Sequence, residues 1–224
     1  MTSPHVDPLQ GVDAVILDLD GTLVDSVYPH VVAWRRALLD VGVDVAAWQI
    51  HRAIGMGGDR LVTAVAGASV ETALGDQVRK LHDEHFEELL DQVTALDGAA
   101  ELLEVLRGRG LQLLLASSGD AGTADRLLDL VEGHSMIRVR VAGGDVERSK
   151  PATDLLDAAL ERGGATRALV VGDSVWDVEA ARARDLPCVA LRTGGVPEAE
   201  LLEAGALDVF DGPAELARRL APSG

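Results

Sequence analysis

Short apolar runs alternate with segments of helical pattern through the second half of this chain. The apolar runs cover residues 111–116, 138–142, 168–172 and 187–191. The helical patterns lie near residues 98–109, 121–132, 152–162, 175–184 and 198–204. Strands that alternate with helices along a chain form a parallel sheet with helices on both faces. The alternation therefore predicts an α/β fold built on a doubly wound parallel sheet.

The first half of the chain has a different pattern, in which one apolar run is followed by helical segments alone. The run is Val15–Leu17. The helical patterns after it cover residues 28–41, 45–54, 58–67 and 71–93. Because no strand pattern interrupts them, this stretch is predicted to form an all-helical block. Trp34 and Trp48 are expected to lie in the core of that block.

Three residues that can take part in metal or redox chemistry are interpreted as structural. His82 and His85 lie three positions apart, but the acids around them indicate a solvated helix face rather than a metal site. Cys188 is the only cysteine, so no intrachain disulfide can form, which fits a reducing compartment. It lies in an apolar run and is expected to be a small buried residue.

The first apolar run ends in two carboxylates, Asp18 and Asp20, followed by Gly21. Residues two apart in a strand share a side, and the glycine marks a turn, so both acids are expected near the carboxyl end of the strand. Two unscreened carboxylates this close repel each other. A hard divalent cation that takes oxygen ligands, such as Mg²⁺, would compensate them.

Three later segments show polar residues at or near predicted strand ends. Ser117 and Ser118 follow one apolar run and are expected at the start of the next helix. Asp173 and Asp177 follow another run and a glycine, which repeats the logic of the opening segment. Lys150 stands beside Pro151 and is one of two lysines against 18 arginines, which suggests that a compact ammonium is required there. Functional groups of doubly wound sheets gather at the carboxyl ends of strands.

Composition limits the classes of partner. With 224 residues and 47% hydrophobic content, the chain can bury the core of one domain with an insertion, or of two small domains. The net charge of −17 makes nucleic acid and anionic membrane surfaces poor partners. The N-terminal residues lack the pattern of a signal peptide, and no apolar run has membrane-spanning length. A soluble, cytoplasmic protein is expected.

In their order along the chain, Asp18/Asp20, Ser117–Ser118, Lys150 and Asp173/Asp177 resemble the four motifs of the haloacid dehalogenase superfamily. The resemblance extends over residues 12 to about 192. It implies a Rossmann-like catalytic core formed by residues 1–26 and 95–224. It also implies a helical cap domain, residues 27–94, inserted after the first strand.

The resemblance implies covalent phosphoryl chemistry at the first motif. Asp18 would be the nucleophile that becomes an aspartyl phosphate, which water then hydrolyses. Asp20 would protonate the leaving alkoxide and later activate the water, while its backbone carbonyl binds Mg²⁺. Thr22 would orient Asp20.

The remaining motifs would bind the phosphoryl group and the metal. Ser117 would donate its hydroxyl to the phosphoryl group, with the amide of Ser118 assisting. Lys150 would bridge Asp18 and the phosphoryl oxygens. Asp173 would bind Mg²⁺ directly, and Asp177 would support the metal through water or through hydrogen bonds to its surroundings. The implied metal set is thus Asp18, Asp20, Asp173 and Asp177.

An acid at position 20 argues for phosphate-ester chemistry, because dehalogenases and phosphonatases of this superfamily lack it. The resemblance favours the capped, phosphoglycolate phosphatase-like branch, and hence a Mg²⁺-dependent phosphatase acting on a small phosphorylated metabolite. A β-phosphoglucomutase-like activity is one alternative, since His30 lies where that enzyme carries a histidine. Gly58, which stands where the mutase has a phosphate-gripping arginine, speaks against it. A binding module without turnover is the other alternative.

Two further side chains are left with open roles. Arg60 either contacts an anionic substrate from the cap or lies on a helix surface. Trp176, between the two late acids, could pack under the site or form one of its walls. The oligomeric state is expected to be a monomer or a homodimer.

Overall fold

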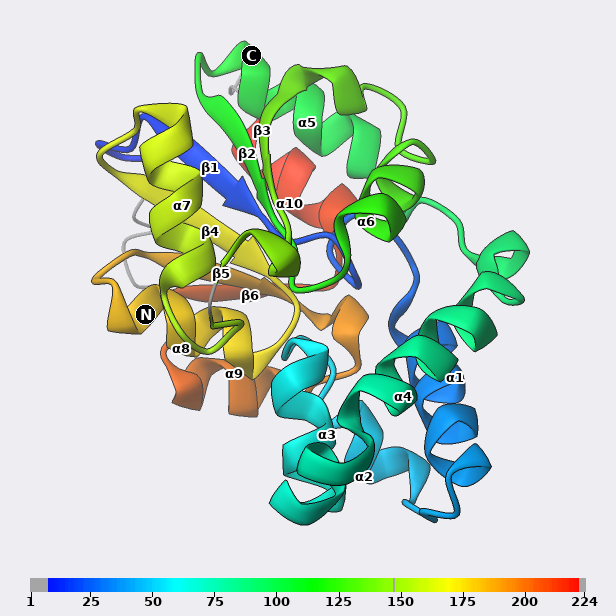
Figure 1. Ribbon diagram of the computed structural model, residues 1–224. Coiled ribbons are helices and arrows are strands. Elements are labelled where there is room, and N and C mark those ends of the chain that lie inside the picture. Colours follow the sequence, from blue (N-terminus) through cyan, green and yellow to red (C-terminus); the bar gives the residue numbers. More distant parts are fainter. Residues whose placement is uncertain (1–7, 147, 222–224) are drawn as a thin grey trace.

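The computed structural model describes residues 8–146 and 148–221 (Figure 1). Its sheet has six parallel strands in the order β3-β2-β1-β4-β5-β6. The strands are β1 (Ala14–Leu17), β2 (Gln112–Ala116), β3 (Ile137–Val141), β4 (Ala168–Gly172), β5 (Cys188–Leu191) and β6 (Asp208–Phe210). The strand order reverses between the neighbouring strands β1 and β4, and in such sheets a crevice for ligands forms at the carboxyl ends of the two strands where the order reverses. The prediction of a doubly wound parallel sheet is confirmed.

Helices cover both faces of this sheet (Figure 1). One layer contains α5 (Ala99–Gly108), α6 (Ala121–Leu128) and α10 (Pro213–Leu220). The other contains α7 (Asp154–Gly163), α8 (Val175–Ala183) and α9 (Glu198–Ala204). Short 3₁₀ turns complete the connections: η1 (Leu90–Gln92), η2 (His134–Met136), η3 (Gly143–Asp145) and η4 (Arg192–Gly194).

Alternate residues of β1 serve the two layers. Val15 and Leu17 lie in the core under α5, α6 and α10, whereas Ala14 and Ile16 lie in the core under α7, α8 and α9. All four are essentially inaccessible to solvent. Successive side chains of a strand point to opposite faces, so a strand with helices on both sides must be apolar at every position. This explains the unbroken apolar run before Asp18.

Four helices between β1 and α5 form a separate body beside the carboxyl edge of the sheet (Figure 1). They are α1 (Val27–Asp40), α2 (Ala47–His51), α3 (Gly58–Ala66) and α4 (Ala68–Glu87). They enclose a hydrophobic cluster of their own, to which α1 contributes Trp34 and α4 contributes Val78. We call residues 27–94 the cap segment. In this segment Trp34 is buried, as expected.

Two expectations about the cap segment are wrong. Trp48 is 68% exposed, because α2 has only five residues and buries Ile50, which points the other way around the helix. His82 is 8% exposed, because it continues the buried stripe of α4 between Val78 and Phe86. The acids that follow His82 in sequence, Asp83 and Glu84, are exposed. His85 is partly covered and bonds to Asp40 at 2.7 Å.

Two elements at the end of the chain, β6 and α10, were not expected from the sequence. β6 has three residues, of which only Phe210 is buried, so it lacks a recognisable apolar run. Cys188 is buried in β5 as predicted, and burial raises the pKa of its thiol. Within the described residues, no helix combines the length and the apolar character needed to cross a membrane.

Candidate functional site

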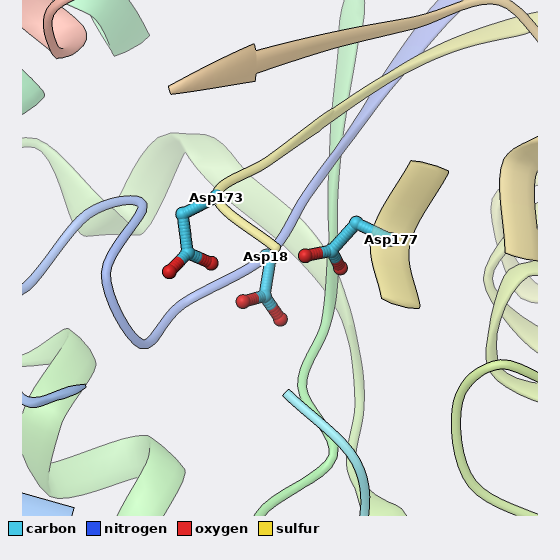
Figure 2. Close-up of side chains that lie close together, drawn as sticks. All are labelled: Asp18, Asp173 and Asp177. Atoms are coloured by element: carbon cyan, nitrogen blue, oxygen red, sulfur yellow. The ribbon is translucent and has the colours of Figure 1, made fainter. Parts of the chain in front are cut away.

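The carboxylates of Asp18, Asp173 and Asp177 converge at the carboxyl ends of β1 and β4 (Figure 2). These strands are neighbours, with Leu17 paired to Val171, so the residues that follow them meet at one edge. The amide of Asp18 donates to the carbonyl of Val171 at 2.9 Å, which extends this pairing. One oxygen from each of the three carboxylates lies within 4.8 Å of the others, and all three residues are buried.

Glycines provide the space for these acids. A Cβ atom at Gly21, or one at Gly194, would overlap the Asp173 carboxylate. Gly21 also has a φ of +74°, a left-handed conformation that side chains other than glycine's rarely adopt. The chain can therefore bring a carboxylate this close to the turn after β1 only with glycine at both positions.

Lys150 is the cation of this cluster and is 2% exposed. Its Nζ lies 2.5 Å from Asp18 Oδ1 and 2.7 Å from Asp177 Oδ1. Burial by itself would lower the pKa of this ammonium, but Asp177 and Asp18 outweigh burial and raise it. The scarcity of lysine in the sequence thus correctly singled out Lys150. Its buried ammonium forms ion pairs with two of the predicted site acids.

One ammonium does not balance three carboxylates. Burial, partly offset by Lys150, raises the pKa of Asp18 to about 7, and burial with Asp177 and Asp18 raises the pKa of Asp173 well above its ordinary value. Asp177 Oδ1 is buried and accepts no hydrogen bond, although it pairs electrostatically with Lys150. Unbalanced charge and an all-oxygen donor set fit a hard divalent cation such as Mg²⁺.

Asp177 is aimed into the cluster by the start of α8. Its Oδ2 accepts from the hydroxyl of Ser174 at 2.6 Å and from the amide of Ser174 at 3.1 Å. In return the Asp177 amide donates to the Ser174 hydroxyl, which forms a capping box at the helix N-terminus. Oδ1 is left to face Asp18 and Lys150, so Asp177 contacts the cluster directly.

The Asp20 carboxylate turns away from the other three acids. Its Oδ1 accepts from the hydroxyl of Ser26 at 2.5 Å and lies 3.0 Å from His30 Nε2. Burial raises the pKa of Asp20, but His30, Ser26 and Lys150 outweigh burial and lower it. Thr22 was expected to orient this acid, but its buried Oγ1 has no hydrogen-bond partner. Ser26 and His30, both near the start of α1, hold Asp20 instead.

Ser117 and Ser118 lie after β2 at the same edge, but they do not cap the next helix. Asp120 is the N-cap of α6, and its carboxylate accepts from the amides of Gly122 and Thr123. Ser117 is fully buried, and Ser118 donates its hydroxyl to the Gly55 carbonyl of the cap segment at 3.0 Å. Neither Ser117 nor Ser118 therefore caps α6.

A cavity of about 70 Å³ lies between this edge of the sheet and the cap segment. Asp18, Asp20 and Ser118 form its floor together with Gly119. Its cap side is mostly apolar and aromatic, and is formed by His30, Trp34, Ile54, Gly55, Met56, Gly58, Leu61 and His82. The predicted nucleophile and the predicted acid thus face one small space.

Two of the residues with open roles lie away from this cavity. Arg60 is half-buried on α3 and does not line it. Trp176 donates its indole N–H to the Arg52 carbonyl at 3.2 Å and lines a larger groove of about 720 Å³ between α2, α3, α8 and α9. Trp176 therefore contacts the cap segment, and it also lines a small cavity of about 70 Å³ together with Asp173.

Each loop that carries a motif also bonds to the cap segment. Ser149, beside Lys150, donates its hydroxyl to Asp59 at 2.8 Å and accepts from the Gly57 amide at 3.1 Å. His51 Nε2 lies 2.8 Å from the carbonyl of Gly194. Farther out, Arg52 pairs with Glu200, and Arg126 pairs with Glu87. These bonds hold the cap segment against the carboxyl edge of the sheet.

Sequence reasoning missed Ser26, His82 and Ser149. Ser26 follows the first motif closely, but the sequence does not indicate which acid its hydroxyl contacts. The spacing of Val78, His82 and Phe86 was the available sign that His82 is buried. Nothing in the sequence around Ser149 predicts its partner Asp59, which is distant along the chain.

Comparisons with known proteins agree with this geometry. Residues 12–185 match a family model described as haloacid dehalogenase-like hydrolase. A phosphoglycolate phosphatase of Pseudomonas putida is 32% identical over 188 residues, which cover 80% of this chain and 69% of that protein.

Solved structures show the same fold. A hydrolase from Pseudomonas syringae superposes with a TM-score of 0.85 at 39% identity, and the match covers 92% of this chain and 97% of that one. A β-phosphoglucomutase from Clostridium difficile superposes with a TM-score of 0.79 at 19% identity, covering 92% of this chain and 93% of that one. The second likeness concerns the fold alone.

Proposed function

Because this chain belongs to the haloacid dehalogenase-like hydrolases, we propose that it hydrolyses small phosphate monoesters through a phosphorylated Asp18. Relatives named phosphoglycolate phosphatase and the family match support a phosphatase. The observation that carries the mechanism is the position of Asp18: a buried carboxylate, paired with Lys150 and lining a cavity that Asp20 also lines.

In the first half-reaction, an Asp18 oxygen attacks the phosphorus while Asp20 gives a proton to the departing oxygen of the alcohol. The bond from phosphorus to the alcohol oxygen breaks, and an aspartyl phosphate forms. Lys150 holds Asp18 Oδ1 at 2.5 Å, which leaves the other oxygen for attack. Ser117 and Ser118 would hold the phosphoryl oxygens, and Lys150 would neutralise charge that develops on them.

In the second half-reaction, Asp20 takes a proton from water, whose oxygen attacks the phosphorus. Phosphate leaves and the Asp18 carboxylate is restored, so the two aspartates return to their starting states. Ser26 and His30 hold Asp20 in both steps. One acid–base group therefore serves both half-reactions.

The carboxylate cluster fits Mg²⁺. Asp18 and Asp173 would hold it with the backbone carbonyl of Asp20, and Asp177 would stand beside it. When bound, the ion would draw charge from the phosphoryl oxygens and neutralise the acids that repel one another here. The donor set carries this assignment, because it contains only oxygen and lacks enough positive charge.

We propose that the cap segment, residues 27–94, is a mobile cap domain on a core made of residues 1–26 and 95–224. The cavity of about 70 Å³ lies between the segment and the carboxyl edge of the sheet, so a movement of the segment would widen the space open to a phosphate ester. Its apolar inner wall would exclude water from the aspartyl phosphate while an alcohol is leaving. The substrate would be a small phosphorylated metabolite.

The test is hydrolysis of 4-nitrophenyl phosphate and of a panel of small phosphate esters, with Mg²⁺ or with EDTA. Activity that needs both Mg²⁺ and Asp18 supports the proposal, with Asp18→Asn as the variant and Asp13→Asn, at the other end of β1, as the matched control. A transient mass increase of one phosphoryl group that Asp18→Asn lacks would identify the intermediate. Absence of turnover in the wild-type protein would overturn the proposal and leave a mutase that needs a bisphosphate primer, or a binding module.

A further inference from the structure

A chain of hydrogen bonds leads from Asp20 through the cap segment to the surface. His30 Nε2 lies 3.0 Å from Asp20 Oδ1, and His30 Nδ1 lies 3.0 Å from His82 Nε2. His82 Nδ1 lies 3.0 Å from Asp83 Oδ1. The Asp83 side chain is 61% exposed, whereas the side chains of both histidines are about 10% exposed. The chain thus connects a half-buried acid to an exposed one through two imidazoles.

The exposed end fixes the direction of these hydrogen bonds. An ionised Asp83 carboxylate can only accept, so His82 Nδ1 must carry the hydrogen. Burial is the largest influence on His82 and, with His30, lowers its pKa to about 4 despite the opposing effect of Asp83. The ring is therefore neutral, and its Nε2 presents a lone pair. His30 Nδ1 must then carry a hydrogen and donate it to His82.

The direction of the hydrogen bond from His30 to His82 limits how His30 can interact with Asp20. With its Nδ1 hydrogen committed to His82, His30 meets Asp20 through Nε2. Without a proton in that contact, two lone pairs would face each other at 3.0 Å. One proton is therefore shared between His30 Nε2 and Asp20 Oδ1, and it lies on one partner or the other.

Aromatic packing keeps both rings in this orientation. His30 stacks on Phe86 with centroids 3.8 Å apart and planes 1° from parallel. His82 stacks on Trp34 with centroids 4.0 Å apart. A rotation of either ring would break a stacking contact as well as its hydrogen bonds. The order of donors and acceptors is thus built into the packing between α1 and α4.

We propose that His82, oriented by Asp83, is a positioning residue for phosphate-ester cleavage: it fixes the ring of His30 and, through that ring, the carboxyl group of Asp20 that protonates the leaving alcohol. This inference rests on the proposed function. When the ester bond breaks, its electron pair goes to the alcohol oxygen, and the proton goes from Asp20 to that oxygen. The water that hydrolyses the aspartyl phosphate returns a proton to Asp20, so the pair is restored.

The test compares two leaving groups in His82→Phe and His82→Gln. Nitrophenolate departs without a proton, whereas the alkoxide from 2-phosphoglycolate needs one. For His82→Phe, kcat/KM should therefore fall by about tenfold or more on 2-phosphoglycolate, and by much less on 4-nitrophenyl phosphate. In His82→Gln the side-chain amide oxygen can accept from His30 Nδ1, which should restore the wild-type ratio. His85→Phe, three residues further along α4, is the control and should leave both values unchanged.

The hydrogen-bond direction itself is tested by nitrogen-15 NMR of the histidines in the wild-type protein at neutral pH. His82 should show a protonated Nδ1 and an unprotonated Nε2. An Nε2-protonated or imidazolium form of His82, or equal losses on both esters in His82→Phe, would overturn the inference. A wild-type protein that hydrolyses neither ester would instead overturn the proposed function, and the NMR result would still decide the hydrogen-bond direction.

Discussion

The strand β1 has an aspartate at each end, and the two have opposite environments. Asp13, before the strand, is exposed and accepts from the amides of Thr166 and Arg167 and from the hydroxyl of Thr166 at 2.9–3.1 Å. Burial is the largest single influence on the pKa of Asp13 and raises it, but these hydrogen bonds together outweigh burial and lower it. Asp18, after the strand, is buried and has a pKa raised to about 7.

The difference follows from what each edge of a parallel sheet offers. At the amino edge, the first amides before a strand point outward and can donate to a carboxylate, as Thr166 and Arg167 do for Asp13. At the carboxyl edge, an amide at the start of α8 donates to one acid of the cluster, whereas Asp18 pairs with the ammonium of Lys150. Asp13 is thus bound by backbone amides, whereas Asp18 lies in a cluster that still lacks positive charge.

The strongest test of this contrast is Asp18→Asn. Turnover should fall by about a thousandfold or more, because an amide cannot attack the phosphorus. Stability should not fall, since the substitution removes one of several repelling charges. Steady-state kinetics and thermal unfolding measure the two effects. Retained turnover would exclude Asp18 as the nucleophile.

Substitution of Lys150 should change both the activity and the stability of the protein. Lys150→Met leaves Asp18 and Asp177 buried without their cation, which should cost about 3–5 kcal/mol of unfolding free energy and remove activity. Lys150→Arg keeps the charge but places a larger, planar group at a site 2% exposed, so activity should still be lost. Denaturant unfolding and kcat/KM give the measurements. Wild-type rates in Lys150→Arg would show that a compact ammonium is not required.

Mg²⁺ should stabilise the folded protein by binding the carboxylate cluster at the carboxyl edge of the sheet. At about one hundred times its dissociation constant, the ion should add about 3 kcal/mol to the unfolding free energy, since it binds only the folded cluster. Asp173→Asn should remove most of this gain while leaving the metal-free protein at least as stable, because it relieves repulsion. Thermal melts with Mg²⁺ and with EDTA test this. An equal gain in wild type and variant would place the ion elsewhere.

Asp13→Asn should have the smallest effect. Activity should stay at the wild-type level, and stability at pH 7 should fall by about 0.5–1 kcal/mol, since hydrogen bonds to an exposed carboxylate are lost. The folded-state pKa of Asp13 lies below its ordinary value of 3.8, so its contribution is present above that pH and disappears as the pH falls through the folded-state value. Unfolding curves of wild type and variant should therefore converge in acid. A difference that persists below both pKa values would refute this account.

The features that were best predicted from the sequence are those that a local pattern of residues determines. The short apolar runs predicted β1 to β5, most directly β1 and β4, which are buried at every position. It did not predict β6, whose three residues at the sheet edge need no such pattern. In the site, Asp18, Lys150 and Asp173 come together as their positions after strands indicated.

What could not be predicted depends on packing between distant segments. The partners of Asp20 follow from how α1 leaves the turn, and the place of His82 follows from how α4 packs on α1. The exposure of Trp48 depends on the short length of α2, which an apolar pattern does not fix. A motif specifies which residues are present, whereas tertiary packing decides which atoms they meet.

The bonds between the motif loops and the cap segment place a condition on its opening. The hydroxyls of Ser118 and Ser149 donate to Gly55 and Asp59 while the cap segment is closed. In the proposed opening, both donors would lose these partners at the edge of the sheet where an anion would arrive. A phosphate ester entering the open site could accept from the same hydroxyls, so opening would exchange one set of acceptors for another. A bound phosphate ester would then stabilise the open form. The lifetime of that form would depend on how long the anion stays bound.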